Sequence, residues 1–78
     1  MDTVSESIEE ARRLLVEGDD KRAADMLTTA AGACSDERSA AMIRALAVQG
    51  RDRAGRFGKR RWDDAIRLSD ERLAQVSQ

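Results

Sequence analysis

The chemistry that this sequence offers most plainly is that of basic side chains. Six of them fall within eleven residues: Arg51, Arg53, Arg56, Lys59, Arg60 and Arg61. Guanidinium groups bind carboxylates and phosphates through paired hydrogen bonds. Phe57 and Trp62 lie beside them in the sequence, where an exposed ring could stack on a base. These six residues, the basic cluster, are therefore the candidate binding site.

The basic cluster has three interpretations at the level of sequence. It is a nucleic-acid site if its side chains reach phosphates, which would make binding strongly salt-dependent. It is a site for an acidic protein or for a second copy of the chain, because residues 1–20 carry seven acids against two arginines while residues 50–61 carry six bases against one acid. It is a solvated turn if Phe57 and Trp62 are core anchors. We favour a protein partner or self-association over nucleic acid.

The remaining reactive residue types argue against catalysis. The chain has no histidine, which is the usual general base at neutral pH. Cys34 is the only cysteine, and its place beside alanines favours a buried, inert thiol. Adjacent carboxylates such as Asp63 and Asp64 point about 100° apart on a helix, so they do not form acid–base dyads. We expect no enzyme activity, no metal site, no cofactor and no small-molecule substrate.

Composition and spacing both favour helices. Thirteen apolar residues are alanine, 37% of the chain is charged, and proline is absent. Alanine has the highest helix propensity and lets helix backbones approach closely. Strands would need β-branched and aromatic residues at every second position, a pattern that this sequence lacks. We predict an all-α fold of four helices, arranged as two stacked antiparallel hairpins or a right-handed helical bundle.

Local signals place these helices within a single domain, residues 1–78. An apolar stripe at helical spacing begins at Val4, and Gly18 ends that helix. Asp19–Asp20 and Ser35–Glu37 are typical helix starts, and three glycines in residues 50–58 mark the last turn. The predicted helices cover residues 4–17, 20–33, 36–53 and 59–76, with i,i+4 ion pairs expected between Glu9 and Arg13 and between Asp63 and Arg67.

A turn glycine followed by alanines is the most specific pattern in the chain. Gly18 precedes Ala23 and Ala30, and residues 11–30 resemble the middle of a tetratricopeptide repeat, in which these alanines pack the second helix on the first. Residues 59–73 are similar to the same segment, with Ala65 in the place of Ala23, although 42 residues separate them where the family repeats about every 34. The resemblance implies a protein-binding module that needs a capping helix, a dimer partner or a ligand.

Some apolar residues lie off the main stripes of their helices: Leu14, Val16, Ala41, Ala45 and Val48. They are buried if the third helix is sandwiched between neighbours, the arrangement that we expect. If exposed, they form a groove for a partner helix or a homodimer seam.

The N-terminus is acidic where a secretory signal would be basic and then apolar. Because no apolar run approaches the ~20 residues that span a bilayer, we expect a cytoplasmic protein without membrane contact. The sequence thus predicts a non-catalytic interaction or adaptor module, able to form a homodimer. The alternative is a small nucleic-acid-binding regulator that uses the basic cluster.

Overall fold

Four α-helices form the described part of the computed structural model, residues 3–55 and 58–76. The helices are α1 (Thr3–Glu17), α2 (Asp20–Ala33), α3 (Glu37–Arg53) and α4 (Lys59–Val76). No strand occurs in these ranges, so the all-α prediction is confirmed. Only the starts of α1 and α3 differ from the expected positions, each by one residue.

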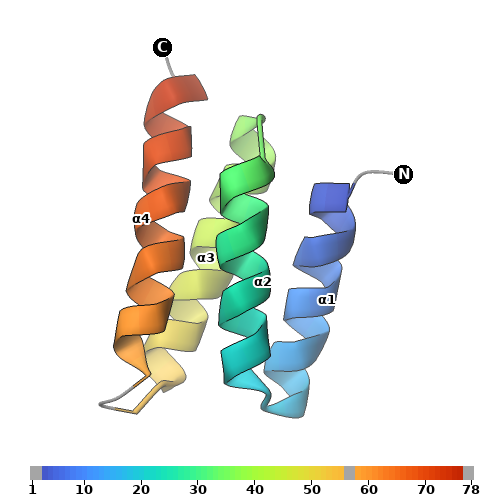
Figure 1. The fold of residues 1–78 in the computed structure, drawn as a ribbon, viewed down its shortest axis with the longest axis vertical. Helices are drawn as coiled ribbons and strands as arrows, with labels where there is room; N and C mark the ends of the chain where they lie inside the picture. Colours follow the sequence, from blue (N-terminus) through green and yellow to red (C-terminus); the bar gives the residue numbers. More distant parts are fainter. Residues whose placement is uncertain (1–2, 56–57, 77–78) are drawn as a thin grey trace.

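The helices run antiparallel to one another in chain order, with α1, α2 and α4 side by side and α3 behind α2 and α4 (Figure 1). The central helix is α2, which contacts the other three, and the pair α3–α4 is the most extensively packed. Within the described ranges α1 and α4 share no contact, so they form the two edges. This order is compatible with two stacked hairpins, α1–α2 and α3–α4.

The first turn is built around Gly18, whose φ angle is 87°. Its N–H donates to the carbonyl of Leu15 at 3.3 Å, and the N–H of Asp19 donates to the carbonyl of Leu14 at 2.9 Å. These two bonds are the Schellman arrangement that satisfies the last carbonyls of a helix. A left-handed residue is required there, and glycine adopts it without steric cost.

The N-termini of α2 and α3 differ in whether an aspartate side chain caps the helix. Asp36 is the N-cap of α3, and its carboxylate accepts a hydrogen bond from the Ser39 N–H at 2.9 Å. Asp19 holds the same position before α2, yet its side chain accepts no capping hydrogen bond within the described ranges. It instead lies 3.8 Å from the guanidinium of Arg22. Side-chain capping is therefore observed at α3 and not at α2.

The core consists of small side chains around a few large ones. Leu27, Ile43 and Trp62 are the largest fully buried apolar residues. Around them lie buried alanines from all four helices: Ala11, Ala23, Ala24, Ala30, Ala31, Ala40, Ala47 and Ala65. Because alanine adds little volume, the helices pack closely on one another.

Trp62 of α4 packs directly on Gly50 of α3. A Cβ added at Gly50 would stand 2.4 Å from two carbons of the indole ring, a distance that no side chain tolerates without displacement of its neighbour. Trp62 is 1% exposed, as in the alternative interpretation in which it anchors the core. Phe57, the other residue of that interpretation, falls outside the described residues.

This contact predicts opposite effects for two glycine substitutions. Gly50→Ala is expected to lower the free energy of unfolding by about 1–3 kcal/mol, because the buried indole must shift to admit the methyl group. Gly32→Ala, near the end of α2, is the matched control, since no described atom lies within 4 Å of its added Cβ. It should raise stability by about 0.5–1 kcal/mol through helix propensity. Urea unfolding of both variants checks this, and an equally stable Gly50→Ala protein would contradict it.

Candidate functional site

Two ion pairs join α3 to α4. The Arg44 Nε lies 2.6 Å from Asp70 Oδ1, and the Arg51 Nε lies 2.5 Å from Asp63 Oδ1. Both the arginines and the aspartates are seven residues apart, about two helical turns, so the pairs repeat along one antiparallel seam. Arg51, the first member of the basic cluster, is thus engaged within its own hairpin.

Two further arginines bind the ends of the first hairpin. Arg53 donates to the carbonyl of Leu15 at 3.2 Å, at the end of α1. Arg72 of α4 donates to the carbonyls of Ala31 at 3.3 Å and Gly32 at 2.7 Å, at the end of α2. The Leu15 carbonyl also accepts from the Gly18 N–H, and the Ala31 carbonyl from the Cys34 Sγ. The guanidinium groups therefore add hydrogen bonds at the carbonyl ends of α1 and α2 and tie the hairpins together. Sequence reasoning missed Arg72 because its acceptors lie about 40 residues away.

Three further members of the basic cluster lie in the first turn of α4. Lys59, Arg60 and Arg61, here called the α4 triad, are exposed. None of them forms an ion pair with a described residue. Arg56 falls outside the described residues. The structure thus divides the predicted site into two structurally engaged arginines and three free basic side chains.

The three positive charges of the α4 triad lie at the positive end of the dipole of their own helix. The N-terminal end of a helix carries partial positive charge, which disfavours cations by about 0.3–1 kcal/mol each. The first turn of α4 contains no acid to offset this. The triad is therefore unfavourable with respect to the dipole of its own helix.

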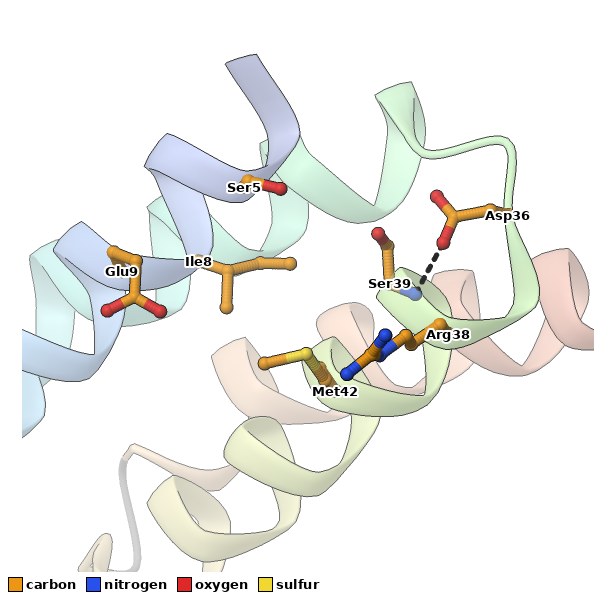
Figure 2. A pocket seen from close by; sticks show the side chains of 7 residues that line it. All are labelled: Ser5, Ile8, Glu9, Asp36, Arg38, Ser39 and Met42. Carbon is orange, nitrogen blue, oxygen red and sulfur yellow. Dashed lines mark hydrogen bonds between the residues drawn. The ribbon is translucent and has the colours of Figure 1, made fainter. Parts of the chain in front are cut away.

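A shallow hollow of about 370 Å³ lies between the N-terminal halves of α1 and α3. Figure 2 shows Ile8 and Met42 facing each other across it, with Arg38 beside Met42. Its two carboxylates already have partners, Glu9 with Arg12 at 3.3 Å and Asp36 with the Ser39 N–H. The hollow is mixed in polarity and has no uncommitted acid among its lining residues.

Two pKa shifts have clear physical causes. The hydrogen bond from the Ser39 N–H holds the pKa of Asp36 below its ordinary value, because it favours the ionised carboxylate. Burial raises the pKa of the Cys34 thiol, and the Sγ donates to the carbonyl of Ala31 at 3.4 Å. Cys34 is therefore buried, as the sequence indicated, and is held as a thiol.

The off-stripe apolar residues do not share one environment. Leu14 is buried in the core, whereas Val16 is 84% exposed. On α3, Ala41 and Ala45 are exposed and Val48 is half-buried. The expectation that α3 buries both faces is wrong, because α1, α2 and α4 contact it and still leave one side uncovered.

No cluster of three or more potential metal-ligating side chains occurs among the described residues. The described helices also include none with the length and apolar character needed to cross a membrane. In comparisons with protein-family models, curated protein sequences and solved structures, no significant match was found.

The cap of α3 predicts a pH dependence of stability. Because the pKa of folded Asp36 lies below its ordinary 3.8, the cap contributes stability above that pH and loses it as pH falls through the folded value. Asp36→Ala should lower the melting temperature at neutral pH, and this deficit should shrink at about pH 2. Asp36→Asn, which keeps an acceptor without the titrating group, is the control. An Ala deficit that is equal at both pH values would contradict the assignment.

Proposed function

We propose that the protein is a non-catalytic interaction module that binds an acidic surface of another protein through the α4 triad. The observation that carries this proposal is the division of the basic side chains. Arg44, Arg51, Arg53 and Arg72 are occupied by partners within the chain. Lys59, Arg60 and Arg61 are exposed and have no ion-pair partner in the described ranges, so they remain available to carboxylates.

The anchoring of α4 supports this role. Trp62 follows the triad directly and is fully buried, so the helix turn that carries the three bases is fixed to the core. Successive residues point about 100° apart, which spreads the three side chains over the end of the helix. A fixed backbone lowers the ordering cost of binding. The end of α4 therefore suits a surface with several separate carboxylates.

The nucleic-acid alternative has less support. Stacking on bases requires an exposed ring, and Trp62 is 1% exposed. Arg51 and Arg53 would have to break their contacts with Asp63 and the Leu15 carbonyl to reach phosphates. Only three of the six candidate bases are then free among the described residues, which reduces the expected phosphate contacts.

The resemblance to tetratricopeptide repeats is part of the same proposal. The left-handed Gly18 and the burial of Ala23, Ala30 and Ala65 support it, since close helix packing at these positions is what the resemblance implies. A cytoplasmic location remains a proposal, for which the free thiol of Cys34 is compatible with a reducing compartment.

A binding measurement with a labelled acidic peptide tests the function. The peptide should alternate glutamate and leucine, and binding should be followed by fluorescence anisotropy at low salt. Replacing the whole triad by alanine should weaken binding at least about tenfold, through loss of three charge contacts. The matched control replaces three other exposed bases, Lys21, Arg22 and Arg67, by alanine and changes net charge equally. It should bind nearly as well as the unmodified protein.

Two outcomes would contradict the proposal. Equal losses in the triad and control variants would mean that net charge alone governs binding. Tighter, triad-dependent binding of a duplex oligonucleotide than of the peptide, with a steep salt dependence, would support the nucleic-acid function instead.

A further inference from the structure

The outward side of α3 is a helix face that no described residue covers. Ala41 and Ala45 are exposed and Val48 is half-buried, although α3 packs on all three other helices. Met42 flanks this face and is also half-buried. Two exposed charges bound it, Arg38 in the first turn of α3 and Asp52 in the last.

These two charges are in an unfavourable position within the monomer. Arg38 lies at the positive end of the α3 dipole and Asp52 at its negative end, the reverse of the stabilising order. Neither forms an ion pair with a described residue. Arg44 and Arg51 of the same helix are both paired. Arg38 and Asp52 are thus exposed charges of α3 that no described residue pairs within 4.0 Å.

The spacing of the charges is self-complementary. Arg38 precedes Ala45 by seven residues and Asp52 follows it by seven, and seven residues are about two turns. All three therefore lie near one face of the helix. If a second α3 packs antiparallel with a twofold axis at Ala45, Arg38 lies opposite the partner's Asp52, and Asp52 lies opposite the partner's Arg38.

We infer that a second copy of this chain covers the outward face of α3, as a twofold homodimer centred on Ala45. Alanines at the centre allow the two helix backbones to approach closely, with Met42 and Val48 beside them as apolar contacts. Both charges then gain a partner, and each lies beside the end of the other helix that its sign favours. The dipoles of the paired helices also oppose each other.

The size of the face sets the expected affinity. One helix pair buries less area than a standard stable interface, so the dimer should dissociate with a constant on the order of 100 µM. This surface differs from the α4 triad. Loss of dimerisation therefore leaves the proposed binding of acidic partners untouched, and the two proposals can fail separately.

Sedimentation equilibrium over a range of protein concentrations is the first test. The average mass should rise from 8.6 kDa toward twice that value as concentration approaches about 1 mM. A mass that stays monomeric over this range would overturn the inference.

Charge reversal then tests the register. Arg38→Asp and Asp52→Arg each place two like-charged pairs in the dimer, so each should weaken it at least about tenfold. A mixture of the two single variants should associate again, because the heterodimer has opposite charges at both contacts. The double variant should also dimerise. This register would be refuted if either single variant dimerised with the same dissociation constant as the original protein. It would also be refuted if the mixture stayed monomeric.

A substitution at the axis provides an independent control. Ala45→Glu places two carboxylates against each other and should abolish dimerisation, whereas Ala74→Glu on the exposed side of α4 should not. Both positions are exposed, so circular dichroism and melting should show that both variants are folded. A folded Ala45→Glu protein that still dimerises would show that another face is used.

Discussion

The contact between the Trp62 indole and the bare backbone of Gly50 lets α3 and α4 pack closely, and the ion pairs along their seam require this close packing. At this separation Arg44 and Arg51 reach Asp70 and Asp63. Arg53 and Arg72, which these two helices carry, then donate hydrogen bonds to backbone carbonyls at the C-terminal ends of α1 and α2. A chain with few large apolar side chains thus compensates for a thin core with one buried indole, close alanine packing and guanidinium caps that join the hairpins.

This arrangement also determines which charges remain free. On the second hairpin, Arg44, Arg51, Arg53 and Arg72 are engaged with other helices of the chain, and their roles are structural. Among the exposed charges without an ion-pair partner in the described ranges are Lys59, Arg60 and Arg61 at the start of α4, and Arg38 and Asp52 on the outside of α3. Both groups oppose the dipole of their own helix. They lie on different surfaces, and these are the two surfaces for which we propose external partners.

The helix ranges could be predicted because their signals are local: Gly18 must be left-handed, Asp36 caps its own helix, and Gly55 and Gly58 lie between α3 and α4. Which charged residues pair with one another could not be predicted from the sequence. The i,i+4 spacing predicted Asp63 with Arg67, but Asp63 faces α3 and pairs with Arg51 while Arg67 lies near Asp64. Arg13 likewise pairs with Glu10 and Glu17, and Glu9 with Arg12. For the candidate site, neighbours in sequence could not show that Arg51 and Arg53 turn toward other helices.

The division of the basic residues into structural and free groups is tested most directly by urea unfolding of single alanine variants. Replacing Arg44, Arg51, Arg53 or Arg72 should lower the free energy of unfolding by about 0.5–1.5 kcal/mol each, because each loses an ion pair or a capped carbonyl. Replacing Lys59, Arg60 or Arg61 should leave it unchanged or raise it slightly, because each removes a cation from the positive end of α4. Equal destabilisation in both groups would contradict the division and the function proposed from it.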